Sequence, residues 1–152
     1  MKRKAIVLDV DGVILNTEFL FEEIYSLKLK GDAMWDYFHK NCNSEKVNLI
    51  EGFYLLYLKL LDMKINSDVE LILLTSRNEK VREATERKLK EEGIFFDRLY
   101  MRLDGDNREA NILKKETLQD LQKEYNILLY IDDDLKNCEA GKELGIYTVR
   151  KV

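Results

Sequence analysis

The segment Ala5–Gly12 constrains the fold of this chain more than any other, because an apolar run ends there in two aspartates. It reads A-I-V-L-D-V-D-G. Alternate side chains of a strand face opposite sides, so Asp9 and Asp11 point the same way where the strand ends, and Gly12 allows a sharp turn there. Two crowded carboxylates repel each other and persist where a cation lies between them or where one holds a proton. Taken alone, the segment is also compatible with an ordinary acidic turn.

Apolar runs alternate with helical patterns along the rest of the chain. Near-continuous apolar strands indicate a largely parallel sheet that is covered on both faces. The alternation predicts an α/β fold with a Rossmann-like, doubly wound sheet, in which ligands bind at the carboxyl ends of the strands. The 152 residues contain no proline, repeat or linker, so we expect a single domain over 1–152. The expected strands are Ala5–Leu8, Leu71–Leu74, Arg98–Met101, Ile127–Ile131 and Tyr147–Val149, and the expected helices are Glu79–Glu92, Asn111–Tyr125 and Leu135–Leu144.

A further helix is predicted over Glu45–Lys64. Its apolar residues recur at helical spacing, which is typical of a helix that packs on a sheet. A contact between two copies of the chain is the alternative, so we expect a monomer or a homodimer. The predicted buried face consists of Val47, Ile50, Tyr54, Leu58 and Leu61, and it is widened by Phe53, Tyr57 and Leu60.

Three later segments place polar groups where strands end or a helix begins. Leu71–Arg77 reads L-I-L-L-T-S-R, and Ile127–Asp134 reads I-L-L-Y-I-D-D-D. Between them, Lys114 and Lys115 lie in a helical stretch that follows Arg108. This order of acid pair, hydroxyl, lysine and acid cluster resembles the haloacid dehalogenase (HAD) superfamily of phosphohydrolases. The resemblance spans nearly the whole chain and implies a HAD-type phosphatase.

The resemblance implies a role for each motif residue. Asp9 corresponds to the nucleophile that forms an aspartyl-phosphate, and Asp11 to the general acid that protonates the leaving alcohol and later activates water. Thr75 corresponds to the hydroxyl that binds a phosphoryl oxygen. Lys114 corresponds to the lysine that neutralises the phosphate, with Lys115 as the alternative. Phosphoryl transfer needs such a nucleophile, a proton donor and neutralisation of charge.

The resemblance also implies a magnesium site. In the double-aspartate pattern of the superfamily the second residue binds the metal, which points to Asp133, while Asp132 orients the lysine or a metal-bound water. With Asp9 and the carbonyl of Asp11, these groups form an all-oxygen set that suits Mg²⁺. Asp134 is expected to cap the helix that follows.

The segment before the lysine narrows the resemblance. From Tyr100 it reads Y-M-R-L-D-G-D-N-R-E-A-N-I-L-K, which is similar to the phosphatase domains related to polynucleotide kinase-phosphatase. Arginine side chains can hold phosphate by two hydrogen bonds, and an aromatic ring can stack on a base. Surface ion pairs for the arginines and packing for the aromatic residues are the alternatives. The residues implied in substrate binding are Ser76, Arg77, Arg102, Arg108 and Trp35, and an insert at about 14–44 is expected to form a small helical cap.

The chain departs from the family pattern at three positions. Val13 replaces a threonine and Ser76 replaces a glycine, and neither change removes a catalytic group. Ala110 stands where an acid is usual two residues after Arg108, which weakens the inference about substrate. His39 is expected to be a surface or packing residue.

Composition limits the partners. The net charge is -4 with acids and bases interleaved, so we expect no long nucleic-acid groove and no attraction to a membrane. The first residues resemble the start of a signal peptide, but the apolar run ends at Asp9, which is too short for export or membrane insertion. Cys42 and Cys138 lack metal-ligand spacing and are expected to be free thiols, which favours a cytoplasmic protein.

These observations together predict a Mg²⁺-dependent phosphomonoesterase that works through an aspartyl-phosphate. The expected substrate is a nucleotide or a nucleic-acid 3′-phosphate end. Two alternatives stay open: a HAD phosphatase of a sugar or other small metabolite phosphate, and a receiver-like phosphoacceptor signalling module. The second is disfavoured because the acid cluster at Asp132 follows the lysine.

Overall fold

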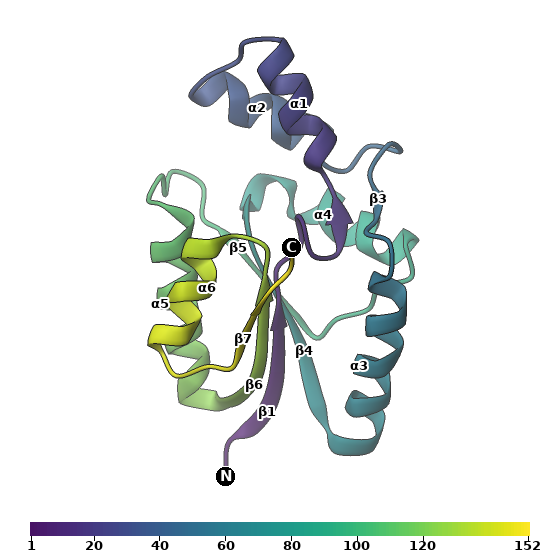
Figure 1. Cartoon of the computed structure of the whole chain (residues 1–152), viewed down its shortest axis with the longest axis vertical. Coiled ribbons are helices and arrows are strands. Elements are labelled where there is room, and N and C mark those ends of the chain that lie inside the picture. Colours follow the sequence, from purple (N-terminus) through teal and green to yellow (C-terminus); the bar gives the residue numbers. More distant parts are fainter.

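A five-stranded parallel sheet forms the centre of the molecule, in a computed structural model that describes residues 1–152 (Figure 1). The strand order is β5-β4-β1-β6-β7, and every neighbouring pair is parallel. The predicted doubly wound, mainly parallel sheet is therefore confirmed. Its strands are β1 (Arg3–Leu8), β4 (Val69–Asn78), β5 (Arg98–Arg102), β6 (Tyr125–Asp132) and β7 (Thr148–Arg150).

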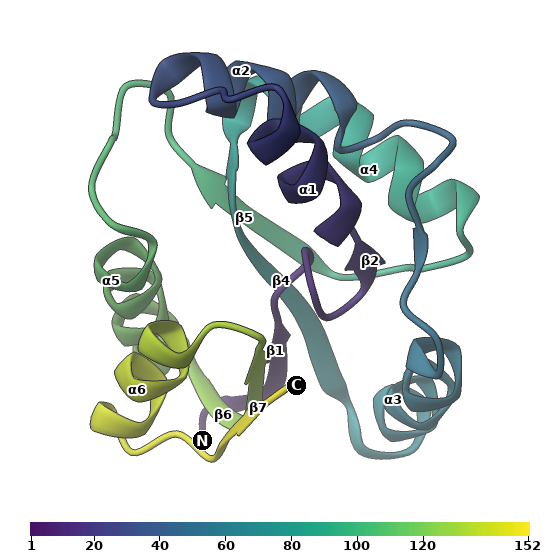
Figure 2. The same ribbon diagram turned by 45° about the horizontal axis from the view of Figure 1, so that its top comes forward.

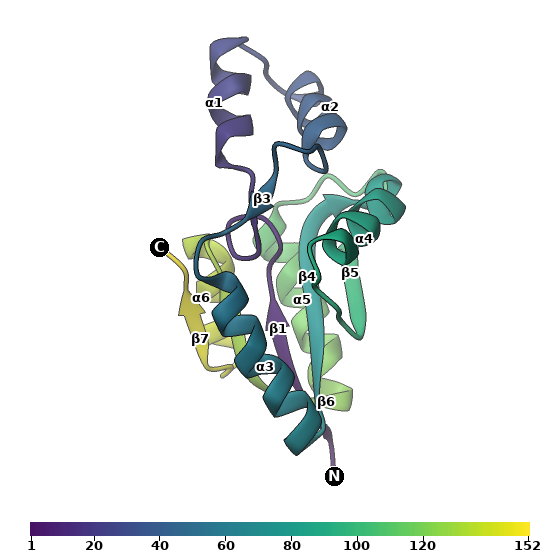
Figure 3. The same cartoon turned by 90° about the vertical axis from the view of Figure 1, so that its right-hand side faces the viewer.

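Helices cover both faces of this sheet (Figures 1 and 3). Successive side chains of β1 alternate between the faces, so Ile6 and Leu8 belong to the apolar cluster with α3 and α4, whereas Ala5 and Val7 belong to the cluster with α5. The two cores hold the carboxyl end of β1 between them. The helices are α3 (Phe53–Ser67), α4 (Arg82–Glu91), α5 (Ala110–Glu124) and α6 (Leu135–Glu143), and a short 3₁₀ turn (Glu79–Val81) precedes α4.

Two further helices, α1 (Glu18–Ser26) and α2 (Asp32–Asn41), form a hairpin above the carboxyl ends of the strands (Figure 2). This α1–α2 hairpin is joined to the sheet domain by two short antiparallel strands, β2 (Leu15–Asn16) and β3 (Asn48–Leu49). The hairpin lies in the region where the sequence predicts a cap. Its own small core consists of Leu20, Ile24, Phe38 and Cys42.

The helix predicted over Glu45–Lys64 starts later in the structure than expected, and only part of its predicted buried face is buried. The chain before Gly52 is extended because β3 pairs with β2, and Gly52 adopts φ +83° just before α3 begins. Within α3, Tyr54 and Leu58 are 50% and 45% exposed. The side that packs on the sheet is the one made by Phe53, Tyr57 and Leu60.

Cys42 and Cys138 are both buried, and neither is in a disulfide. None of the helices combines the length and the apolar character that a membrane crossing requires.

Candidate active site

Asp9 directly follows the central strand β1 and is only 5% exposed. Its Oδ1 accepts the Val10 N–H at 2.8 Å and lies 3.0 Å from Lys114 Nζ. Burial raises the pKa of Asp9 well above its usual value, Lys114 opposes the shift, and the neighbouring aspartates add to it. A carboxyl group buried in this way is ionised only if positive charge lies close to it.

Lys114 of α5 lies between Asp9 and Asp132 and is almost fully buried. Its Nζ donates to Asp132 Oδ2 at 2.7 Å. Burial alone would lower the pKa of Lys114, but these two carboxylates raise it above its usual value, so the ammonium form is secure. Lys115, the alternative in sequence, points elsewhere and pairs with Glu143 at 2.5 Å.

Asp132, the last residue of β6, is held by several donors besides the lysine. The Tyr130 hydroxyl donates to Oδ2, the Asn137 amide lies 3.2 and 3.3 Å from the two oxygens, and the Asp134 N–H donates to Oδ1 at 3.0 Å. Burial opposes ionisation, yet Lys114, the Tyr130 hydroxyl and the Asp134 N–H lower the pKa of Asp132. Asp132 therefore fixes the position of Lys114.

Two further carboxylates, those of Asp132 and Asp133, lie close to that of Asp9. One oxygen from each of Asp9, Asp132 and Asp133 lies within 4.8 Å of the others. Gly12 makes room for Asp133, because a Cβ at Gly12 would lie 2.0 Å from Asp133 Oδ2. Burial raises the pKa of Asp133, as it does for Asp9. Three acids facing one ammonium group leave an excess of negative charge, so the residues fit a divalent cation with oxygen ligands.

Asp11 is turned away from that group and binds Arg77. The two carboxylate oxygens accept from Arg77 Nε at 2.9 Å and Nη2 at 2.7 Å, and Thr17 Oγ1 lies 3.2 Å from Oδ1. The Arg77 side chain is 0% exposed. The motif implies a substrate contact for Arg77, but in the structure its guanidinium faces only protein groups.

Thr75 and Lys114 line one cavity of about 160 Å³ between β4, β5 and α5. Thr75 is buried, and its hydroxyl accepts the Arg77 N–H at 3.1 Å. The same cavity brings together three of the residues implied in substrate binding, namely Ser76, Arg102 and Arg108.

Both arginines at this cavity already have protein partners. Arg102 donates to the carbonyl oxygens of Ser76, Asp106 and Arg108, so it holds the loop between β5 and α5. Arg108 pairs with Asp106 at 2.9 Å and Glu116 at 2.6 Å and stays 48% exposed. Of the two, Arg108 is the exposed one, and surface ion pairs such as its own contribute little to stability.

Trp35 of α2 does not line this cavity and is 47% exposed. Its ring contacts Phe38 edge-on at 6.1 Å and lies 6.4 Å from the ring of His39. His39 is half-buried, and its Nε2 accepts the Asn78 N–H at 3.2 Å. The packing role expected for His39 is therefore confirmed.

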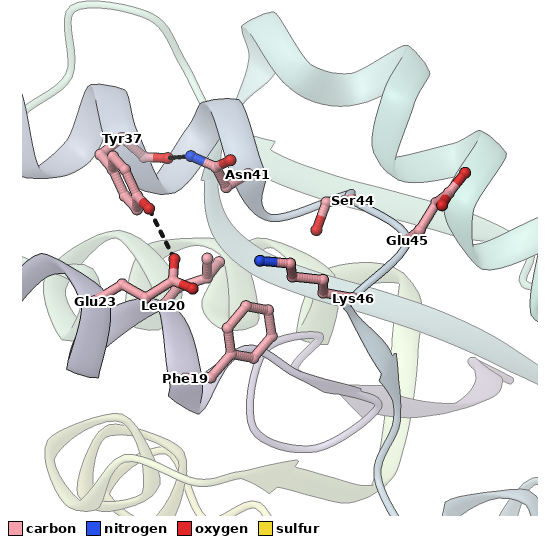
Figure 4. A pocket seen from close by; sticks show the side chains of 8 residues that line it. All are labelled: Phe19, Leu20, Glu23, Tyr37, Asn41, Ser44, Glu45 and Lys46. Atoms are coloured by element: carbon pink, nitrogen blue, oxygen red, sulfur yellow. Dashed lines mark hydrogen bonds between the residues drawn. The ribbon is translucent and has the colours of Figure 1, made fainter.

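A larger cavity of about 380 Å³ lies between α1, α2 and the segment 44–46 (Figure 4). Glu23, Tyr37 and Lys46 point into it, and the Tyr37 hydroxyl donates to Glu23 at 2.7 Å. None of the candidate catalytic or metal-binding residues lines this cavity.

Several neighbours of the site were missed in the sequence. Tyr130 precedes Asp132 by two residues in one strand, and residues at that spacing share a face, so the pattern contained this partner. Asn137 lies in the first turn of α6, where the Asp134 side chain accepts its N–H at 3.0 Å, as the cap prediction requires. Thr85 and Asn43, which bind Arg77, have no sequence feature that marks them.

Comparison with solved structures finds proteins of similar fold. A chain of the Pnkp1/Rnl/Hen1 RNA repair complex is 25% identical with a TM-score of 0.73, over 98% of this chain and 42% of that chain. This chain thus spans less than half the length of that relative. The class C acid phosphatase from Bacillus anthracis with tungstate bound is 15% identical with a TM-score of 0.61, over 100% of this chain and 69% of that one.

A third solved structure is a HAD family enzyme from Bacteroides thetaiotaomicron in a magnesium complex. It is 18% identical with a TM-score of 0.54, over 99% of this chain and 93% of that chain. No curated protein matches the sequence significantly.

The family itself follows from a sequence profile. The profile described as HAD superfamily, subfamily IIIB (Acid phosphatase), matches residues 1–149, which is nearly the whole chain and includes every motif residue discussed above. The acid pair, hydroxyl, lysine and acid cluster lie at one edge of the sheet, and the matching profile is that of a phosphatase family. The receiver-like signalling module is therefore excluded. The chain belongs to subfamily IIIB of the HAD superfamily, a subfamily described as acid phosphatases.

Proposed function

We propose that the protein is a Mg²⁺-dependent phosphomonoesterase that transfers the phosphoryl group to Asp9 and then to water. The observation that supports this most is the pairing at Asp9. Both of its N–H donors, from Val10 and Lys114, lie on Oδ1, which leaves Oδ2 as the attacking oxygen. The buried ammonium group faces both this carboxylate and the cavity lined by Thr75, where phosphoryl oxygens would lie.

The reaction proceeds in two displacements. Asp9 Oδ2 attacks phosphorus, the bond to the leaving oxygen breaks, and Asp11 gives that oxygen a proton. Asp11 then takes a proton from water, whose oxygen attacks the phosphoryl group, and Asp9 is released as a carboxylate. Throughout both steps Lys114 and the Thr75 hydroxyl bind the phosphoryl oxygens.

The metal ligands in this proposal are the carboxylates of Asp9 and Asp133, with the carbonyl of Asp11. When bound, Mg²⁺ supplies neutralisation of the phosphoryl charge. Asp132 is assigned to the lysine rather than to the metal, because four neighbouring groups already donate to its oxygens.

For the substrate we propose a nucleotide or a nucleic-acid 3′-phosphate end, with the α1–α2 hairpin as the cap. The RNA repair relative supports this class, Arg108 is exposed and lines the same cavity as Ser76, and Trp35 of the hairpin is exposed. The small cavity of about 160 Å³ and the existing partners of Arg102 favour a second candidate, a small metabolite phosphate.

Phosphate release tests the mechanism and the substrate together. We expect Asp9→Asn to lose activity by about a thousandfold or more, because the nucleophile is removed. Asp120→Asn, an exposed aspartate of α5, is the control and should keep full activity. EDTA should abolish activity and Mg²⁺ should restore it. Activity that persists in chelator, or in Asp9→Asn, would contradict the mechanism.

Substrate preference is measured with 3′-phosphorylated dinucleotides, nucleoside monophosphates and hexose phosphates. We expect the first two to have the higher kcat/KM, with shallow salt dependence because few phosphates are contacted. Arg108→Ala should reduce kcat/KM for nucleotides more than for 4-nitrophenyl phosphate, whereas Arg87→Ala, an exposed arginine of α4, should affect neither. A clear preference for a hexose phosphate would favour the metabolite phosphatase instead.

A further inference from the structure

We propose, on the basis of the function proposed above, that Arg77 is a positioning residue that couples the placement of the α1–α2 hairpin to that of the Asp11 carboxylate. The motif that contains Arg77 implies a substrate contact. The hydrogen bonds of its guanidinium indicate a different role.

All five N–H donors of the Arg77 guanidinium are used within the protein. A guanidinium has one donor on Nε and two on each Nη. Nε and Nη2 bind the two oxygens of Asp11, Nη2 also donates to the Cys42 carbonyl at 3.1 Å, and Nη1 donates to Asn43 Oδ1 at 2.6 Å and to Thr85 Oγ1 at 3.1 Å. With no donor left and a side chain that is 0% exposed, Arg77 has nothing to offer a phosphate.

The partners of this ion pair lie on both connections of the hairpin. Thr17, which binds Asp11, directly precedes α1, whereas Cys42 and Asn43, which bind Arg77, directly follow α2. Figure 3 shows the hairpin standing above the sheet on these two connections. The hairpin therefore cannot shift relative to the sheet domain without changing hydrogen bonds to Asp11 or Arg77.

On the side of the sheet domain, Arg77 is anchored by Thr85, which belongs to α4. Asn78, the residue that follows Arg77 in β4, donates its N–H to His39 of α2, which is a further link between β4 and the hairpin. Asp11 is the only carboxylate bonded to Arg77, so no other acid balances the charge of the buried guanidinium. Such coupling is reciprocal: the hairpin places the acid, and the acid places the hairpin.

The first test compares leaving groups, because a misplaced acid matters most when the leaving oxygen needs a proton. We expect Asn43→Ala and Thr85→Val to lower kcat/KM for phenyl phosphate about tenfold more than for 4-nitrophenyl phosphate, the scale of one lost hydrogen bond to a charged group. Asn41→Ala is the matched control, since that side chain binds only the Tyr37 carbonyl within α2. Its ratio should stay that of the unmodified protein.

Equal losses on both substrates in Asn43→Ala and Thr85→Val would overturn the coupling. Asp11→Asn is the reference for the proposed function and should itself slow phenyl phosphate more than 4-nitrophenyl phosphate. If Asp11→Asn affects the two substrates equally, the assignment of Asp11 as general acid fails, and the second test still decides the coupling.

The second test needs no activity, because Trp35 of α2 is the only tryptophan and its fluorescence reports on the hairpin. We expect Asp11→Asn to increase acrylamide quenching of Trp35 and to shift its emission, although Asp11 does not belong to the hairpin. Asp120→Asn should leave the fluorescence unchanged. Unchanged quenching in a folded Asp11→Asn variant would refute the coupling.

Discussion

Two buried cations bind the two acids of the Asp9–Asp11 pair, Lys114 binding Asp9 and Arg77 binding Asp11, and they differ in how many of their donors are occupied. The Lys114 ammonium has three donors, and the protein uses two of them, on Asp9 and Asp132. The Arg77 guanidinium has five, and the protein uses all five. Lys114 therefore has one donor free, which we propose binds a phosphoryl oxygen, whereas Arg77 has none free and binds Asp11 and the connections of the hairpin.

Lys114 and Arg77 also differ in the groups that surround them. Lys114 faces carboxylates that the strands β1 and β6 fix in place, and it lines the cavity beside Thr75. Arg77 faces Asp11 and the connections of the α1–α2 hairpin. Burial alone therefore does not distinguish a cation proposed to act in catalysis from one that holds the structure, whereas the number of free donors does.

The largest expected effect separates the two cations by activity. Lys114→Met should lower kcat/KM by about a thousandfold on every substrate, regardless of leaving group, because the charge that neutralises phosphate is lost. Lys115→Met, one residue later and paired with Glu143, is the control. A loss of activity in Lys114→Met that is larger for poor leaving groups would contradict the distinction between the two cations, since that pattern is expected when partners of Arg77 are removed.

The next effect is on stability. Arg77→Lys should reduce the free energy of unfolding by about 3 kcal/mol, because the three donors of a lysine cannot replace the five hydrogen bonds that Arg77 makes in the fully buried site. Denaturant unfolding measures the change. Arg87→Lys, on the exposed face of α4, should leave the stability nearly unchanged. Equal stability of the two variants would show that the five hydrogen bonds of Arg77 contribute little.

A smaller effect on stability tests the hydrogen bonds of Asp132, which binds Lys114. Tyr130→Phe removes the hydroxyl that donates to buried Asp132 and should destabilise the protein by about 2 kcal/mol, the scale of a hydrogen bond to a charged group. Tyr25→Phe changes an 86% exposed side chain and is the control. If thermal unfolding of Tyr130→Phe matches that of the control, Asp132 does not need this donor to hold Lys114.

The sheet and the residues at its edge could be predicted because both depend on local pattern. Asp9 and Asp132 follow or end strands whose apolar runs are visible in the sequence, and parallel strands bring such ends together. The choice between Lys114 and Lys115 was resolved only by the structure, because their order along α5 does not say which one faces the sheet.

The rest depended on contacts that are distant in sequence. Arg77 and Asp11 are 66 residues apart, and nothing near Arg77 indicates that its donors are already occupied. In α3 both sides of the helix are apolar, so periodicity could not choose between Tyr54 and Tyr57 as the buried ring. The glycine at Gly52 was the available sign that the helix starts later than predicted.

The smallest expected effect is a pH dependence at the contact between the hairpin and β4. Burial, and then the charge of Arg77, lowers the pKa of His39 below its usual 6.5, so the folded protein holds it neutral. Below pH 6.5 the unfolded chain therefore binds more protons at this residue, and stability falls as the pH drops through that value towards the folded pKa. His39 is the only histidine, so His39→Gln should lose less stability between pH 8 and pH 5 than the unmodified protein does. Other titrating groups are common to both proteins and cancel in the difference. Parallel curves of unfolding free energy against pH would mean that His39 is free to ionise in the fold and that its bond to Asn78 does not hold the hairpin.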